Sequence, residues 1–340
     1  MSYFAEQVTP GHPDKLADQI SDGILDAILA QDPYARVAVE SLVTGSHIIL
    51  AGETATAAEV DVKQVVENVI TSTGYTEKWW PHLHEVQLLN LIQPQSPDLN
   101  QNIGDGAGDQ GTMYGYAVRE EHYLPPEYMI ATAAAHAIYA LHRERPDEFG
   151  CDGKTTATLD DYGKLTGITV AIHHGIPLNQ CRSEVEDYVR AALNVDCPIA
   201  VNTSGAFTVG GAVADTGLTG RKIIADTYGG RGRHGGGAFS GKDARKVDRT
   251  GAYYARHLAI RALEQLDAYE VEVQLGYSIG DLYPRALTIV ADGEKVEWRP
   301  SEGLFTPRQV ADKFGLHKPI HSESTCFGHF TDMTKSWNRL

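Results

Sequence analysis

Hydrophobic and polar positions repeat in the same order three times along the chain. In each unit, two runs of alternating β-branched residues flank a turn, which is the pattern of two neighbouring strands. A segment with apolar residues about 3.6 positions apart follows each pair and predicts a helix. The runs and helices are 36–43, 47–51 and 61–73 in the first unit; 155–159, 165–174 and 183–193 in the second; and 270–279, 285–291 and 307–314 in the third.

Two longer helices are predicted outside these units. The first covers 13–31, where Pro13 suits the first helical position and apolar residues recur every fourth position. The second covers 243–266, where Asp243 is a suitable N-cap and small and apolar residues share one face. The two faces consist of Leu16, Ile20, Ile24 and Ile28 in the first helix and Ala252, Ala255, Ala259 and Leu263 in the second.

The three units predict a protein of the α/β (α+β) class with three similar domains, each built on a strand–strand–helix repeat. A single mixed α/β domain with coincidental hairpins is the alternative, because the copies share little sequence identity. The length of 340 residues suits two or three domains of about 100–200 residues each.

Charge and composition narrow the classes of function. The formal net charge of −16 argues against nucleic acid as a partner, because phosphate backbones bind basic surfaces. No apolar run reaches the roughly 18 residues of a membrane span, and Met1–Pro10 lacks the basic segment of a secretory signal. We therefore expect a cytoplasmic protein that does not bind membranes. None of its four cysteines forms a C-x-x-C pair, so free thiols are expected rather than a zinc site.

The segment Gly11–Lys15, with the sequence Gly-His-Pro-Asp-Lys, lies at the start of the first predicted long helix. Helix N-termini favour anions, and an aspartate there can hold a divalent cation that bridges to phosphate. A capped helix with ordinary surface charges is the alternative. Asp14, Asp18, Asp22 and Asp26 recur every fourth position, so most of them are interpreted as a solvent-exposed acidic face.

The region 207–248 has the richest chemistry, because Arg221, Lys222, Lys242 and Lys246 occur there among glycine-rich loops. This combination suits a polyphosphate: backbone amides of glycine loops approach it closely and ammonium groups neutralise it. Asp248 can hold magnesium beside it. A second glycine-rich segment, 104–111, carries two carboxylates able to bind a metal or an amine, with a surface loop as its alternative.

The segment Gly236-x4-Gly241-Lys242 matches most of a P-loop, the phosphate-binding loop that opens a helix after a strand. The next residue is Asp243, where a P-loop needs a Ser or Thr hydroxyl for magnesium. A P-loop-like ATPase is therefore the alternative function rather than the favoured one.

The chain resembles the S-adenosylmethionine synthetase (methionine adenosyltransferase) family. The resemblance rests on 11–15, on Gly-Ala-Gly-Asp-Gln-Gly at 106–111 and on Gly-Gly-Gly-Ala-Phe-Ser-Gly-Lys-Asp at 235–243, with further matches at 215–230 and 246–249. It implies that methionine sulfur attacks the ribose C5′ of ATP, that the whole triphosphate leaves, and that the triphosphate is then hydrolysed to phosphate and pyrophosphate. It also implies three interleaved domains: N-terminal, 1–10 plus 120–210; central, 11–100; and C-terminal, 101–119 plus 211–340.

The resemblance also implies roles for individual residues. The catalytic residues would be His12, which assists triphosphate departure, Lys154, which contacts phosphate near the reacting centre, and Arg221, which serves triphosphate cleavage. ATP and its phosphates would be bound by Glu6, Lys15, Phe207, Asp215, Lys222, Lys242 and Lys246. Methionine would be bound by Glu53, Gln95 and Asp109. Asp14 and Asp248 would hold two Mg²⁺ ions per site, and Glu40 would help to bind K⁺. The implied partners are ATP, L-methionine and further copies of the chain, in a homodimer or homotetramer with sites at the dimer interface.

The sequence departs from the family in several connections. It is shorter by roughly forty residues, and the connection at 100–106 is clipped where the family has a longer mobile loop, which affects water exclusion and product release. The segment 202–207 lacks the Pro and Arg that family members commonly have there. Thr9-Pro10 stands where the family usually has Ser-Glu. A non-catalytic, ATP-binding regulatory protein is a further alternative, but it predicts loss of His12, Lys154 or Arg221, and all three are present.

Overall fold

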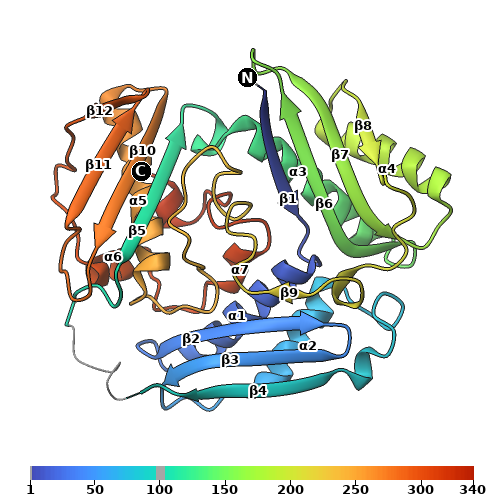
Figure 1. Ribbon diagram of the computed structural model, residues 1–340, viewed down its shortest axis with the longest axis horizontal. Coiled ribbons are helices and arrows are strands. Elements are labelled where there is room, and N and C mark those ends of the chain that lie inside the picture. Colours follow the sequence, from blue (N-terminus) through green and yellow to red (C-terminus); the bar gives the residue numbers. More distant parts are fainter. Residues whose placement is uncertain (1, 97–103) are drawn as a thin grey trace.

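The computed structural model describes residues 2–96 and 104–340 and arranges three four-stranded sheets around a common centre (Figure 1). We number the sheets by strand order: sheet I is β4-β3-β2-β9, sheet II is β1-β6-β7-β8, and sheet III is β12-β11-β10-β5. Each sheet contributes to a hydrophobic core of its own. Three separate cores exclude a single mixed domain, so the predicted three-domain α/β fold is confirmed. The expected short connection at 100–106 falls largely outside the described residues.

Sheet I contains the first predicted hairpin, β2 (Arg36–Thr44) and β3 (His47–Ala55), and the helix α2 (Val62–Thr73) follows it. The strand β4 (Gln87–Pro94) pairs in parallel with β3, and the short β9 (Gly217–Leu218) joins the other edge. The helix α1 (Pro13–Leu29) packs on β2 and α2. Its predicted apolar face is buried, with Leu16, Ile20 and Ile24 all at 0% exposure. Each such residue stabilises the fold by roughly 1.5–3 kcal/mol.

Sheet II contains the second predicted hairpin, β6 (Phe149–Leu159) and β7 (Leu165–His174), and the helix α4 (Leu178–Leu193) follows it. The N-terminal strand β1 (Tyr3–Val8) pairs antiparallel with β6, and β8 (Ile199–Val201) pairs in parallel with β7. The helix α3 (Pro126–Glu144) lies against β6 and β1. No unit of the predicted repeat contained α3, because its buried face is largely alanine and gives no stripe of large apolar residues.

Sheet III contains the third predicted hairpin, β10 (Glu270–Tyr277) and β11 (Ala286–Ala291), with β12 (Glu294–Val296) and β5 (Gly111–Val118) at its edges. The helices α5 (Val247–Leu266) and α6 (Pro307–Phe314) belong to the same core. The prediction that α5 starts at Asp243 is wrong, because its N-cap is Lys246. The Asp243 carboxylate instead accepts hydrogen bonds from the backbone N–H groups of Val37 and Arg245, which fixes it outside the helix.

The strands divide among the sheets in an interleaved way. Sheet II takes strands from 3–8 and 149–201, whereas sheet III takes them from 111–118 and 270–296. The short helix α7 (Ser322–Thr325) and the loops that follow β9 fill the centre between the sheets (Figure 1). Among the described residues, no helix has both the length and the apolar character needed to cross a membrane.

Candidate active site

His12 forms the N-cap of α1. Its Nδ1 accepts a hydrogen bond from the backbone N–H of Asp14 at 3.2 Å, which leaves the ring proton on Nε2. Burial is the main cause that lowers the pKa of His12 to about 3, and the positive charge of Lys222 adds to it. His12 is therefore a neutral hydrogen-bond donor at neutral pH. The turn before it requires glycine, because a Cβ on Gly11 would lie 2.5 Å from the backbone of Cys151.

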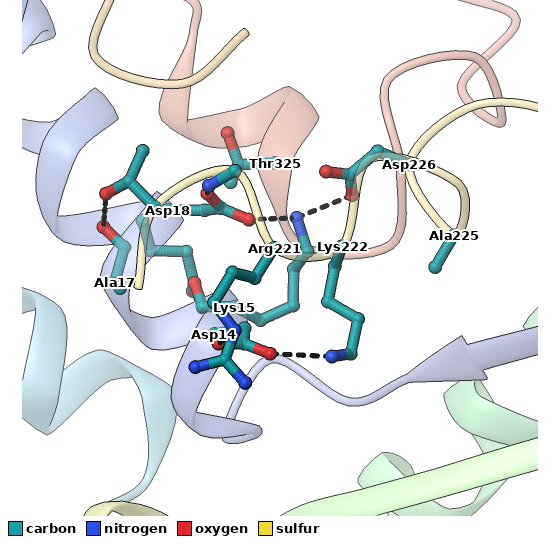
Figure 2. A network of polar contacts seen from close by, with 12 residues as sticks. Asp14, Lys15, Ala17, Asp18, Arg221, Lys222, Ala225, Asp226 and Thr325 are labelled. Atoms are coloured by element: carbon teal, nitrogen blue, oxygen red, sulfur yellow. Dashed lines mark hydrogen bonds and ion pairs between the residues drawn. The ribbon is translucent and has the colours of Figure 1, made fainter. Parts of the chain in front are cut away.

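Asp14 is in the first turn of α1, and its carboxylate lies between the basic side chains of Arg221 and Lys222 (Figure 2). Its Oδ2 is 2.6 Å from Nζ of Lys222, and its Oδ1 is 3.4 Å from Nε of Arg221. The backbone N–H of Leu218 donates to Oδ1 at 3.0 Å. Burial opposes ionisation of Asp14, but the hydrogen bonds from Lys222 and Leu218 outweigh burial and lower its pKa. The group predicted to hold a metal is thus an ionised carboxylate.

Lys154 reaches the same end of α1 from β6. Its Nζ is 2.5 Å from Oε2 of Glu6 on the neighbouring strand β1, and both side chains are partly exposed. In the strand register Lys154 lies opposite Val8, four residues before His12, and its charge contributes to the lowered pKa of His12. The structure therefore brings together Glu6, His12, Asp14, Lys154, Arg221 and Lys222, and we call these six residues the α1 cluster.

Lys15 does not join this cluster, although it was predicted to bind phosphate. Its side chain is 0% exposed, and Nζ is 2.7 Å from Asp18 and 2.5 Å from Asp226 (Figure 2). These two carboxylates raise the pKa of Lys15 against the effect of burial. The Lys15 ammonium is therefore committed inside the protein, and we assign it a structural role.

The interpretation of the α1 aspartates as a solvent-exposed face is wrong, because Asp18 is 1% and Asp22 is 0% exposed. These carboxylates bind the backbone of the loops that carry the predicted site. Asp18 accepts from the N–H of Gly220 at 2.8 Å, and Asp22 accepts from the N–H of Gly241 at 2.8 Å. The helix thus positions both the segment of Lys222 and that of Lys242.

A second group of predicted residues lies at the N-terminus of α5, and we call it the α5 cluster: Lys242, Lys246 and Asp248. Nζ of Lys242 is 2.5 Å from Oδ2 of Asp248, and Lys246 pairs with Asp243. A Cβ on Gly237 would lie 2.3 Å from the Asp248 carboxyl carbon, so the glycine loop passes directly over this group. In both clusters a lysine therefore neutralises the carboxylate that was predicted to hold a metal.

The structure does not have the arrangement of loop and helix that a P-loop needs. In a P-loop, the lysine and the following hydroxyl residue open the helix. Here α5 begins at Val247, and Lys242 forms an isolated antiparallel bridge with Ala38 instead.

The remaining predicted residues lie around the α1 cluster or on exposed surfaces. Phe207 stacks on His173, with ring centroids 5.5 Å apart, and Asp215 is exposed in the loop before β9. Glu40 on β2 and Glu53 on β3 both belong to the exposed face of sheet I. The partly buried Gln95 follows β4, and Asp109 is exposed just before β5. Among the described residues, Glu53, Gln95 and Asp109 therefore come from three separate segments of the chain.

The two clusters lie apart in one chain. On α1, Asp14 contacts Lys222 of the α1 cluster, and Asp22 contacts Gly241 in the loop of the α5 cluster. Eight residues of helix separate them, which corresponds to about 12 Å. The residues predicted to bind phosphate therefore form two separate groups in one chain.

Two buried charged residues near the clusters were not predicted from the sequence. Asp152 on β6 is buried and accepts from the N–H of Gly211 at 2.7 Å, and burial raises its pKa to about 7. Arg249 is 0% exposed and donates to both oxygens of Asp22 at 2.8 Å. Arg249 lies in the matched run 246–249, but its partner is 227 positions away, so no local pattern could reveal the pair.

Comparisons with known proteins agree with this geometry. Three family models match the chain: the N-terminal domain of S-adenosylmethionine synthetase over residues 1–97, the central domain over 104–207 and the C-terminal domain over 209–339. The chain belongs to the S-adenosylmethionine synthetase family. The family models run consecutively along the sequence, whereas the strands of sheets II and III come from separated segments.

Individual members of the S-adenosylmethionine synthetase family resemble the chain over nearly its full length. The S-adenosylmethionine synthase of Sorangium cellulosum is 37% identical over 369 residues, which cover 99% of this chain and 87% of that protein. The one from Salinibacter ruber is 37% identical and covers 99% and 95%. The solved structure of an unusual S-adenosylmethionine synthetase from Campylobacter jejuni is 30% identical, with a TM-score of 0.91 and coverage of 100% and 97%.

Proposed function

We propose that the protein synthesises S-adenosyl-L-methionine from ATP and L-methionine and then hydrolyses the released triphosphate to phosphate and pyrophosphate. The observation that carries this proposal is the α1 cluster, in which a neutral His12 lies beside three cationic side chains. Family membership supports the same activity. It gives no support to a P-loop ATPase or a regulatory ATP-binding protein.

The chemistry of the proposed reaction explains why these side chains are needed. A new bond joins the methionine sulfur to C5′ of the ribose, and the C5′–oxygen bond breaks with its electron pair leaving on the triphosphate. The leaving group gains negative charge, and cations already held in place stabilise it at no cost of reorganisation. His12 would donate its Nε2 proton in a hydrogen bond to the departing oxygen. Lys154 and Lys222 would neutralise the phosphates.

The second step adds water across a phosphoanhydride bond of the bound triphosphate, which gives phosphate and pyrophosphate. Arg221 suits this step, because its guanidinium is 51% exposed and contacts Asp14 only at 3.4 Å. It can therefore turn to a phosphoryl group without breaking a tight ion pair. We propose that this residue serves hydrolysis more than adenosyl transfer.

The carboxylates of the two clusters suit magnesium. Mg²⁺ in nucleotide sites usually takes one or two carboxylates together with phosphate oxygens and water. Among the residues that the structure describes, no three acidic, histidine or cysteine side chains form a complete metal cage, which fits ions shared with a substrate. Asp14 and Asp248 would each hold one ion, which would neutralise part of the polyphosphate charge. Lys222 and Lys242 would then leave these carboxylates and bind phosphate. Glu40, exposed on β2, would help to bind potassium.

A second copy of the chain would complete the site. Glu40 and Glu53 lie on the face of sheet I that its helices do not cover, next to the exposed apolar residues Leu89 and Leu91. In the parallel register, Glu53 neighbours Gln93 and Ala51 neighbours Leu91. A partly apolar sheet face that carries predicted substrate-binding residues fits an isologous interface. We propose a homodimer, or a homotetramer built from it, in which the α1 cluster of one copy meets the α5 cluster of the other. A cytoplasmic location stays a prediction from the sequence.

A matched pair of histidine variants tests the assignment. His12→Asn should lower the rate of S-adenosylmethionine formation by at least a hundredfold, since it removes a positioned donor. His84→Asn is the control, because His84 is 68% exposed and pairs with Glu77 away from the α1 cluster. Both variants should keep the far-UV circular dichroism of the parent. Near-normal synthesis by His12→Asn would reject the role of His12.

A further inference from the structure

Three arginines gather at the opposite end of α1 from His12. Arg36 begins β2, Arg245 precedes α5, and Arg308 is the second residue of α6. Arg245 and Arg308 line a pocket of about 90 Å³ together with Tyr34 and His317. We call this feature, with Arg36 beside it, the arginine pocket.

Within the described part of the chain, the three arginines of the pocket are not held in tight ion pairs with carboxylates. Among the described residues, the guanidinium groups of Arg36 and Arg245 have no hydrogen-bond or ion-pair partner. Arg308 reaches only Asp105, at 3.4 Å, and both of those side chains are more than half exposed. Other basic groups, such as Lys222, form tight ion pairs with carboxylates.

Two carboxylates, Asp105 and Asp243, line the pocket, and Asp243 is already committed to other partners. Asp243 accepts at Oδ2 from the N–H of Val37 at 2.7 Å and from Lys246, and at Oδ1 from the N–H of Arg245 at 2.8 Å. Burial and then the charge of Arg36 lower the pKa of Arg245; the Asp243 carboxylate opposes them, and Arg308 adds a smaller lowering effect. The three arginines therefore outnumber the two carboxylates of the pocket, and one of these carboxylates, Asp243, already pairs with Lys246.

We propose that the arginine pocket binds a small, doubly charged tetrahedral oxyanion of the phosphate type. Guanidinium groups bind phosphate oxygens through paired N–H donors, and an anion here would relieve the mutual repulsion. Pro307 and Arg308 line the pocket, so the N-terminal turn of α6 adds favourable partial charge. A volume of about 90 Å³ admits a phosphate group. It does not admit a nucleotide, because ligand pockets usually need about 300 Å³ or more.

The pocket is separate from the α1 cluster. Leu29, which lines it, lies fifteen residues along α1 from Asp14, a distance of about 22 Å. An anion bound there would therefore lie away from His12 of the same chain, although Asp243 and Arg245 lie between Lys242 and Lys246 of the α5 cluster. The inference goes beyond the proposed function, and it does not depend on that function.

Isothermal titration of the full chain with inorganic phosphate, in chloride buffer at constant ionic strength, tests the proposal. Arg245→Gln should weaken binding at least tenfold, whereas Arg233→Gln should leave it unchanged, because Arg233 pairs with Glu272 on the surface. Lys222→Gln removes a phosphate-binding group of the α1 cluster, so the Arg245-dependent component of phosphate binding should persist in that variant. Methyl phosphate is the second titrant: equally tight, Arg245-dependent binding would identify the ligand as the phosphoryl group of a larger molecule. Rejection of methyl phosphate would identify it as the free anion.

Thermal unfolding without phosphate separates binding from misfolding. Arg245→Gln should unfold at the parent temperature or above it, because it removes like-charge repulsion. Phosphate binding that survives in Arg245→Gln but disappears in Lys222→Gln would overturn the proposal, as would the absence of millimolar binding by the parent protein.

Discussion

The buried ion pair between Asp22 and Arg249 gives the sharpest prediction about stability. It joins two domains, and neither charged side chain is exposed to solvent. Both side chains are 0% exposed, and both N–O contacts are 2.8 Å. Asp22 also accepts from the N–H of Gly241 and from the hydroxyl of Thr325. Removing one partner of such a pair costs about 3–5 kcal/mol, since it leaves a buried charge without compensation.

Asp22→Asn removes the charge and keeps the size of the side chain. We expect it to lower the free energy of unfolding by about 3–5 kcal/mol, which is a large part of the roughly 5–15 kcal/mol that stabilises a typical domain. Urea unfolding can be followed by the fluorescence of the four tryptophans, of which Trp337 stacks on Tyr253 with ring centroids 4.4 Å apart. Tyr253 in turn accepts a hydrogen bond from Arg249, so part of the signal comes from this region.

Two further variants complete the test. Arg285→Met is the surface control, because Arg285 is 70% exposed, and its pair with Asp281 should be worth at most about 1 kcal/mol. The double variant Asp22→Asn with Arg249→Met should be less destabilised than the sum of its single variants, since neither charge is then left alone. Equal losses in Asp22→Asn and Arg285→Met would refute the reasoning.

Four other predictions follow from named contacts. Arg221→Leu should slow triphosphate hydrolysis more than adenosyl transfer, and equal losses in both rates would reject that division. Gly11→Ala should abolish synthesis and lower the melting temperature, because its Cβ would lie 2.5 Å from the Cys151 backbone; parent-like activity would show that the turn can adapt. The pKa of His257 is lowered from 6.5 to about 4, mainly by burial, so below pH 6.5 the unfolded chain binds a proton that the folded chain excludes. Stability should therefore fall from pH 6.5 to pH 4, and His257→Gln should reduce this slope by up to roughly 1.4 kcal/mol per pH unit in urea titrations. Leu91→Glu should shift the protein to monomers in size-exclusion chromatography with light scattering and abolish synthesis; an active monomer would contradict the shared site.

The sequence predicted the hairpins well because their strands are buried on one face. The strand β10 alternates strictly between partly buried and buried positions, and such alternation is visible in the sequence. The helix α3 escaped the prediction because its buried positions are mostly small, and a face of alanines gives little periodic contrast.

In the candidate site, only the residues that belong to recognisable motifs could be predicted from the sequence. His12, Asp14, Lys154, Arg221 and Lys222 meet as expected from the resemblance, although their roles stay predictions. The α1 aspartates were misread because their partners come from distant segments. The loop glycine bound by Asp22 is 219 positions away, and the one bound by Asp18 is 202 positions away. A helix with charges every fourth residue looks solvated unless those long-range contacts are known.

The most direct test of the proposed function is product analysis after the protein is mixed with ATP, methionine, magnesium and potassium. We expect S-adenosylmethionine together with equal amounts of phosphate and pyrophosphate, and little ATP consumption when methionine is omitted. ADP and phosphate formed without S-adenosylmethionine, or ATP binding with no turnover, would contradict it.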